Sequence, residues 1–162
     1  MALAMYQEGE AVVVRDATGS ARIESREGRL RYTPVDRDVL GYSAVLERLA
    51  AEGKARDGFV ADEDWFAATV DHPWPDAPRR IWDAFHGGAA SHPAAMVSMR
   101  DGWCAGLASF EKLIRMASTH CGLNQVNSAT FVMTMTGRTS GPMRTRDVLG
   151  VLEPGHVFNV KR

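Results

Sequence analysis

The sequence predicts an α/β domain with an amino-terminal antiparallel meander, followed by a layered mixed sheet with flanking helices. Strand-like alternation of apolar and polar residues fills much of the first third of the chain. After Pro34 a helical period replaces it, and in the second half short apolar runs alternate with helical stripes. Such alternation of strands and helices favours a layered arrangement.

The chain has 162 residues, of which 45% are hydrophobic and 24% charged. That length can bury one sizeable core and is too short for two large ones. We therefore expect a single domain over residues 1–162, β-rich over 1–34 and mixed α/β over 42–162. The compositional seam falls between Pro34 and Gly41.

The formal net charge of -1 gives no field that would favour nucleic acid or an anionic membrane as a partner. No apolar run approaches the roughly 20 residues of a membrane-spanning helix, and the first residues lack a signal-peptide pattern. Cys104 and Cys121 are therefore expected as reduced thiols, which indicates a cytoplasmic location.

In the first third, strands are predicted around Ala11–Val14, Ala21–Glu24 and Leu30–Tyr32. The turn-forming stretches 16–20 and 25–28 separate them. Together they predict a small antiparallel meander.

Three helices are expected next. The first runs from about Ser43 to Glu52 and stops at Gly53, a common residue after a helix end. Asp62 and Asp76 are predicted to cap the other two. Gly87-Gly88 ends the third helix, and an aromatic-rich stretch across these two helices predicts core packing, with a substrate or partner surface as the alternative: Trp65, Phe66, Trp74, Trp82 and Phe85.

Beyond residue 94 the runs 95–99 and 130–135 are short and apolar, as in buried strands of an α/β protein. A helical segment is predicted between them, around residues 110–116. Thr145 is expected to cap a last helix that extends through Leu152.

The segment Ser118–Leu123 places His120 in a turn of small residues between a predicted helix and a predicted strand. A neutral imidazole is a common ligand of zinc and similar ions. Spacing alone favours a turn-capping histidine over a metal ligand. Ser118 and Thr119 are interpreted as turn formers, because adjacency to a histidine does not supply the base and orienting group of a nucleophile.

The order of three segments favours the interpretation of His120 as a metal ligand. Ser118-Thr-His-Cys-Gly-Leu123, Thr130-Phe-Val-Met133 and Arg144-Thr-Arg-Asp-Val-Leu149 resemble the end of alkaline phosphatase-like phosphodiesterases and phosphatases. Upstream similarity extends through 94–103, 76–81 and 14–23 and covers most of the chain. The resemblance implies the carboxy-terminal part of the alkaline phosphatase-like fold, with His120 binding one of two metal ions.

Two residues depart from the family pattern: Cys121 stands at a usual glycine and Gly150 at a frequent proline. The family's Ser or Thr nucleophile and its other metal ligands come from segments before the matched region. The family chemistry uses one metal to activate the nucleophile and both to neutralise phosphoryl charge. The resemblance therefore implies that this chain is a partial domain. It would bind a divalent metal ion, zinc or a similar ion, only if another segment completes the site.

An independent metal site built from cysteines and histidines is disfavoured because its spacing matches no paired-ligand pattern. The residues considered for it are Cys104, His120, Cys121 and one of His72, His86, His92 or His156. Asp101 and Asp147 are assigned to a turn and to a first helical turn rather than to catalysis. No catalytic and no cofactor-binding residue is predicted.

Two functions follow. The first is a partial metal-dependent phosphohydrolase that supplies the ligand His120, lacks the nucleophile and is inactive as an isolated chain; its substrate and metal stay open. The alternative is a non-catalytic module that recognises a phosphate-containing small molecule or a protein. A partial sheet exposes strand edges, so we expect an amino-terminal half or a homo-oligomer to cover them.

Overall fold

The computed structural model describes residues 2–87, 92–100, 122–130 and 141–148. The chain divides into two compact units, Met1–Ala129 and Thr130–Arg162. The α/β class is confirmed, since the first unit combines a seven-stranded sheet with helices.

Every strand pairing in the described sheet is antiparallel, in the order β5-β6-β4-β3-β2-β1-β7. The prediction of a mixed sheet is therefore wrong for this part of the chain. The strands are β1 (Leu3–Glu8), β2 (Ala11–Arg15), β3 (Ser20–Arg26), β4 (Arg29–Pro34), β5 (Ala55–Arg56), β6 (Phe59–Val60) and β7 (Ala95–Ser98).

The predicted meander is confirmed by the pairings β2–β3 and β3–β4. Strand β1, which the sequence analysis did not predict, extends it by pairing with β2. Glu27 and Gly28, which join β3 to β4, have φ values of 53° and 77°. Positive φ at two successive residues is the geometry of a two-residue hairpin whose twist matches that of its strands. Asp57 and Gly58, with φ of 51° and 78°, make the equivalent connection between β5 and β6.

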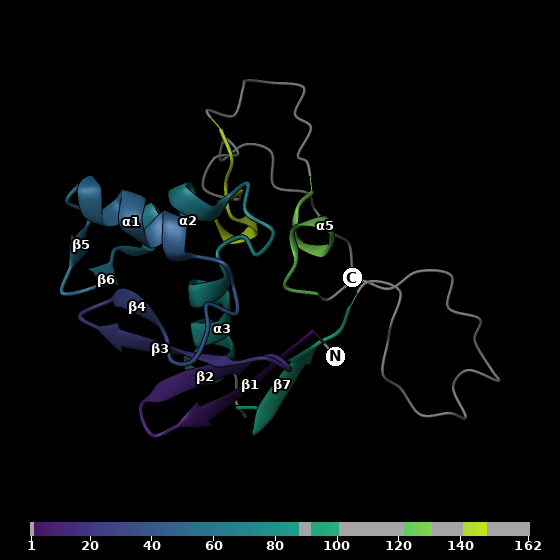
Figure 1. The fold of residues 1–162 in the computed structure, drawn as a ribbon. Coiled ribbons are helices and arrows are strands. Elements are labelled where there is room, and N and C mark those ends of the chain that lie inside the picture. Colours follow the sequence, from purple (N-terminus) through teal and green to yellow (C-terminus); the bar gives the residue numbers. More distant parts are fainter. Residues whose placement is uncertain (1, 88–91, 101–121, 131–140, 149–162) are drawn as a thin grey trace, which may run out of the picture. The chain divides into compact units, whose positions relative to one another are not determined.

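Three helices lie on the same side of this sheet: α1 (Ser43–Ala51), α2 (Asp62–Thr69) and α3 (Ala77–His86) (Figure 1). Alternate strand residues face them, and each large aliphatic side chain buried there contributes about 1.5–3 kcal/mol. This core contains Leu3, Met5, Val12, Val14, Ile23, Leu30, Tyr32, Val60, Leu49, Trp65, Ile81 and Phe85. The predicted core role of Trp65 and Phe85 is confirmed.

The start of α1 is held by Asp38, which precedes the helix. Its Oδ2 accepts hydrogen bonds from Ser43 N at 2.6 Å and from Ser43 Oγ at 2.7 Å. Burial acts to raise the pKa of Asp38, but the hydrogen bonds from Ser43, the Tyr42 amide and Tyr32 bring it below its usual value. At the other end Gly53 has φ of 70°, so the predicted helix stop is confirmed.

The predicted caps of α2 and α3 need correction. Ala61 occupies the N-cap of α2. Asp62 is the first helical residue, where its negative charge interacts favourably with the helix dipole. Asp76 is the N-cap of α3 but has φ of 52°, and its side chain makes no capping hydrogen bond. At the other end, α3 stops at Gly87, as predicted, where an added Cβ would lie 2.4 Å from the Asp83 carbonyl oxygen.

Strand β7 confirms the expected strand at 95–99 but not its burial. It lies at one end of the described sheet, and Val97 is 52% exposed. Periodicity cannot separate such an edge strand from a central one, because short apolar runs suit both.

The remaining described elements are α5 (Gln125–Ser128) in the first unit and a 3₁₀ turn (Thr145–Asp147) in the second. Thr145 is not a cap, since Arg144 holds that position. The predicted helix at 110–116, most of the predicted strand at 130–135 and the end of the last predicted helix lie outside the described residues. Within the described part of the chain, no helix is long and apolar enough to cross a membrane.

Candidate functional site

The predicted metal ligand His120 lies outside the described residues. The same holds for several other residues of the sequence analysis, namely Asp101, Cys104, Ser118, Thr119, Cys121, Gly150 and His156. The structure does describe the segment that begins two residues after His120. The candidate site is therefore built from that segment and its contacts.

The segment Gly122–Ala129 contacts the rest of the first unit through its backbone amides and contains the single turn α5. Gln125 N donates to the Pro73 carbonyl at 2.8 Å, and Leu123 N lies 3.4 Å from Ser98 Oγ at the end of β7. The side chain of Asn124 accepts from Asn127 N at 3.2 Å and so caps α5. Leu123 packs against the core.

Arg80 of α3 makes the most extensive contact with this segment. Its Nη1 donates to the Leu123 carbonyl at 3.0 Å and to Ser128 Oγ at 2.8 Å. Its Nη2 donates to the Gly122 carbonyl at 3.3 Å. Nη1 also lies 3.3 Å from the Pro75 carbonyl, so one guanidinium joins the loop before α3 to both ends of the turn.

Arg80 keeps its charge although it is partly buried. Burial lowers the pKa of its guanidinium, and the nearby charge of Asp76 opposes that shift. Arginine stays protonated in proteins, so the group remains a cation with donors in a planar fork. Hydrogen bonds from a charged donor to carbonyl oxygens are worth more than neutral ones, at roughly 1.5–3 kcal/mol.

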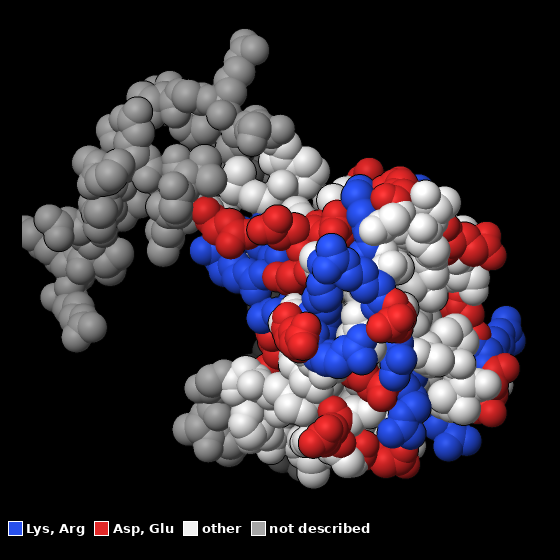
Figure 2. All heavy atoms as spheres, turned by 90° about the vertical axis from the view of Figure 1, so that its left-hand side faces the viewer, with Lys and Arg blue, Asp and Glu red and all other residues white. Residues whose placement is uncertain are grey.

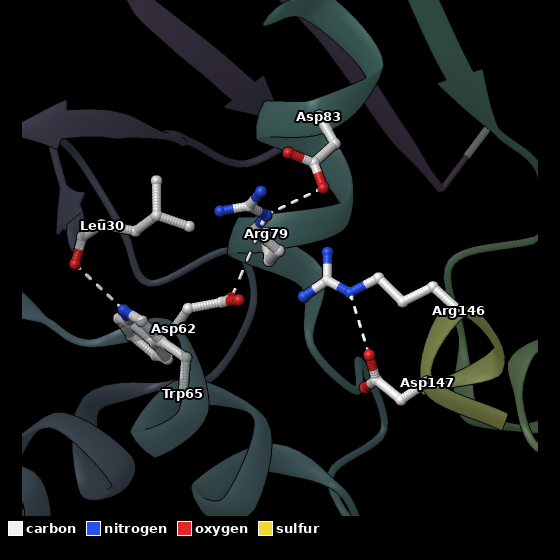
Figure 3. A network of polar contacts seen from close by, with 7 residues as sticks. All are labelled: Leu30, Asp62, Trp65, Arg79, Asp83, Arg146 and Asp147. Atoms are coloured by element: carbon white, nitrogen blue, oxygen red, sulfur yellow. Dashed lines mark hydrogen bonds and ion pairs between the residues drawn. The ribbon is translucent and has the colours of Figure 1, made fainter. Parts of the chain in front are cut away.

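The neighbouring Arg79 makes a different set of contacts on the same helix. Its Nε lies 2.8 Å from an oxygen of Asp83 and 4.0 Å from one of Asp62, so it links α3 to the first turn of α2. Figure 3 shows Arg79 between these two carboxylates. The adjacent residues Arg79 and Arg80 thus contact different parts of the first unit: Arg79 contacts α2, and Arg80 contacts the segment Gly122–Ser128.

Among the candidate histidines, His72 has both ring nitrogens engaged. Trp74 N donates to its Nδ1 at 3.1 Å, so the proton lies on Nε2, which is 3.3 Å from the Gly41 carbonyl. Its ring also packs against Tyr42, with centroids 4.6 Å apart. His72 is therefore a structural residue.

His86 stacks on Trp82, with ring centroids 3.7 Å apart and planes at 9°. Its Nδ1 lies 3.3 Å from the Trp82 carbonyl, and its Nε2 lies 3.4 Å from Gln7 Nε2. Within the described residues, no group of three or more histidine, cysteine or acidic side chains could hold a metal ion. In the second unit, Asp147 pairs with Arg146 at 3.7 Å.

Charged side chains cover the sheet face opposite the helices over β3 and β4. Phe59 of β6 lies there, only 5% exposed, with the guanidinium carbons of Arg26 and Arg31 at 4.4 and 4.6 Å from its ring centre. Arg26 pairs with Asp57 at 3.1 Å and Arg31 with Glu24 at 2.8 Å. Figure 2 shows basic and acidic groups interleaved. Charge pairs of this kind create no broad positive field for a polyanion.

Comparison of the chain with family models, with curated proteins and with solved structures finds no match.

Arg80 is the residue that sequence reasoning missed. The buried positions Ala77, Ile81 and Phe85 define the inward stripe of α3. Arg80 lies three residues after Ala77 and therefore borders that stripe. A charged residue beside an apolar helical stripe is a signal for a buried polar contact, but it does not name the partner.

Proposed function

We propose that this chain is the carboxy-terminal part of a metal-dependent phosphohydrolase of the alkaline phosphatase-like superfamily. In this proposal His120 binds one divalent metal ion, zinc or a similar ion. A segment outside these 162 residues supplies the nucleophile and the other metal ligands. The metal ions would activate that nucleophile and neutralise the charge of the phosphoryl group.

The observation that carries the proposal is the order of the segments 118–123, 130–133 and 144–149, which resembles the end of that superfamily. The described contacts are compatible with it. The turn that directly follows the His120 segment is attached by Arg80, Pro73 and Ser98 to α3, to the preceding loop and to β7. A metal ligand needs a fixed backbone on at least one side, because its geometry must match that of the ion.

The proposal also names a partner. Among the described strands β7 pairs only with β1, and its Val97 is exposed. A sheet edge with apolar side chains is a surface that another chain can extend by strand pairing. The missing amino-terminal part, or a second copy of this chain, would cover it.

Reconstitution tests the function. The polypeptide encoded directly upstream in the same orientation would be co-expressed with this chain, and hydrolysis of aryl phosphate mono- and diesters would be measured with zinc or manganese. We expect metal-dependent hydrolysis by the pair, none by either part alone, and at least a hundredfold loss in His120→Ala, on the order of the effect of losing a metal-site residue.

Cys121→Gly is the matched control, because it restores the residue typical of the family next to His120. It should retain or increase the activity of the pair. Unchanged hydrolysis in His120→Ala would contradict the ligand assignment. A stable chain that binds phosphate compounds, but gives no hydrolysis with any upstream partner, would favour the alternative of a non-catalytic binding module.

A further inference from the structure

We infer that His72 is a pH-sensitive switch in the loop between α2 and α3: its neutral imidazole holds this loop in place, and protonation of the ring releases the contact between the loop and the segment Gly122–Ala129. All of these residues lie in the described part of the first unit. None of them takes part in the proposed hydrolysis, so the switch does not depend on that function.

The surroundings of His72 determine which protonation state the loop requires. Trp74 N donates to Nδ1 at 3.1 Å, and Nε2 lies 3.3 Å from the Gly41 carbonyl oxygen. An amide donor on one side and a carbonyl acceptor on the other are both satisfied only by a neutral ring that carries its proton on Nε2. A second proton, on Nδ1, would place two donors against each other at the contact with Trp74. The observed arrangement therefore requires the neutral imidazole.

The same loop holds the segment Gly122–Ala129. The Pro73 carbonyl accepts a hydrogen bond from Gln125 N at 2.8 Å. Pro73 lies between His72 and Trp74, so the hydrogen bond from Trp74 N to the imidazole closes a small ring around Pro73 and fixes the direction of its carbonyl. Loss of that hydrogen bond lets the Pro73 carbonyl turn away from Gln125.

The other titratable groups around the ring do not change charge between pH 5 and 8. Tyr42 packs against the ring from the start of α1, and burial raises the pKa of its hydroxyl well above the usual value, so the hydroxyl stays protonated. The charged side chains on the adjoining loops and helix starts are carboxylates and arginines, types that ordinarily keep their charge over this range: Asp38, Glu47, Asp71, Asp76, Arg79 and Arg80. Histidine is the side chain that ordinarily changes charge there. Because the loop holds the neutral form, its attachment is complete at the higher pH and is lost as the pH falls.

The matched variant is His72→Asn. An asparagine side-chain oxygen accepts a hydrogen bond from the backbone amide two residues further on, and an asparagine before a proline favours such a turn. This is the bond that His72 accepts from Trp74 across Pro73. His72→Asn therefore keeps the acceptor and removes the group that binds a proton. His72→Phe keeps a ring against Tyr42 and removes the acceptor at every pH.

The test follows backbone amides of the whole chain by nuclear magnetic resonance between pH 7.5 and pH 5. Isotope labelling of tryptophan alone gives a backbone signal for each of the four tryptophans, and Trp74→Phe identifies that of Trp74. At pH 5 we expect this signal to move upfield in the wild type. Protection of the Trp74 and Gln125 amides against hydrogen exchange, corrected for the intrinsic effect of pH, should fall about tenfold, as for loss of roughly one hydrogen bond. The Trp65 amide, in α2, should stay protected and reports that the protein remains folded.

His72→Asn should keep both amides protected at pH 5, whereas His72→Phe should lose this protection already at pH 7.5. His86→Asn is the control at another histidine. The Nδ1 of His86 faces the Trp82 carbonyl oxygen, so protonation of His86 leaves that contact in place. The variant should leave the response of Trp74 to pH unchanged.

An equal response of Trp74 to pH in the wild type and in His72→Asn, or no response in either, would overturn the switch. A response of Trp74 without loss of protection at Gln125 would overturn the release of the segment Gly122–Ala129. Neither readout involves a metal or a substrate, so failure of the proposed phosphohydrolase function is a separate result.

Discussion

Single residues define the core of the first unit, and Trp65 is the clearest case. Its side chain is fully buried, and its Nε1 donates to the Leu30 carbonyl at 3.0 Å, as Figure 3 shows. This hydrogen bond connects α2 to strand β4. The aromatic pattern of the sequence predicted the burial of Trp65, but the bond to a residue 35 positions away could not be read from periodicity.

Trp65→Phe should keep most of the apolar contact and leave the Leu30 carbonyl without its donor. We expect a loss of about 1–3 kcal/mol in the free energy of unfolding, measured by denaturant titration. Trp82→Phe is the control, because Trp82 is only partly buried and stacks on His86. Equal losses in both variants would show that the hydrogen bond is not what distinguishes Trp65.

At the scale of elements, the sequence predicted those with a long or regular pattern. The meander and α1 were found because alternation and a helical stripe each extend over several residues. Strands β5 and β6 were missed because each has only two residues, too few to show a period. The order of the strands in the sheet depends on long-range pairing, which local patterns do not encode.

The start of α1 gives a prediction that depends on pH. The pKa of Asp38 is lowered in the folded protein, so its carboxylate stabilises the fold above the unfolded value of about 3.9 and loses that contribution as the pH falls below it. Asp38→Ala should cost about 1–2 kcal/mol at pH 7, as for loss of a helix cap. Parallel denaturant titrations at pH 7 and pH 3 measure this.

The difference between wild type and Asp38→Ala should be smaller at pH 3 than at pH 7, because Asp38 of the unfolded chain binds a proton below about 3.9 and the contribution of the folded carboxylate declines as the pH falls towards its lowered pKa. Asp36→Ala serves as the comparison, since the Asp36 carboxylate accepts a hydrogen bond from Ser20 rather than from Ser43 of α1. A difference that is equal at both pH values would contradict the role of the ionised Asp38 carboxylate.

For the whole molecule, the candidate site was the part least accessible to sequence reasoning. The order of motifs pointed to His120, while the residue that attaches the following turn, Arg80, comes from a helix more than forty positions earlier. A pattern can place a charged residue beside a buried stripe, but only the fold identifies what it holds. The position of β7 at the edge of the sheet is likewise visible only in the fold, because it depends on which strands pair.

The exposed edge strand predicts self-association of the isolated chain. Val97→Lys places a charge on β7, and charged edge residues oppose strand pairing between molecules. We expect light scattering to show association of the wild-type chain with rising concentration and a weaker effect in Val97→Lys. Val35→Lys is the control at another exposed valine, 57% exposed and outside the strands. The same association in all three proteins would contradict a role for β7.

The central claim is that this chain supplies one ligand to a metal site that it does not complete. Titration calorimetry of residues 1–162 with zinc and with manganese, beside His120→Ala, tests it most directly. We predict no saturable micromolar binding by either protein, because one histidine cannot hold the ion alone. Tight binding that is abolished by His120→Ala would show a self-contained site and contradict the account.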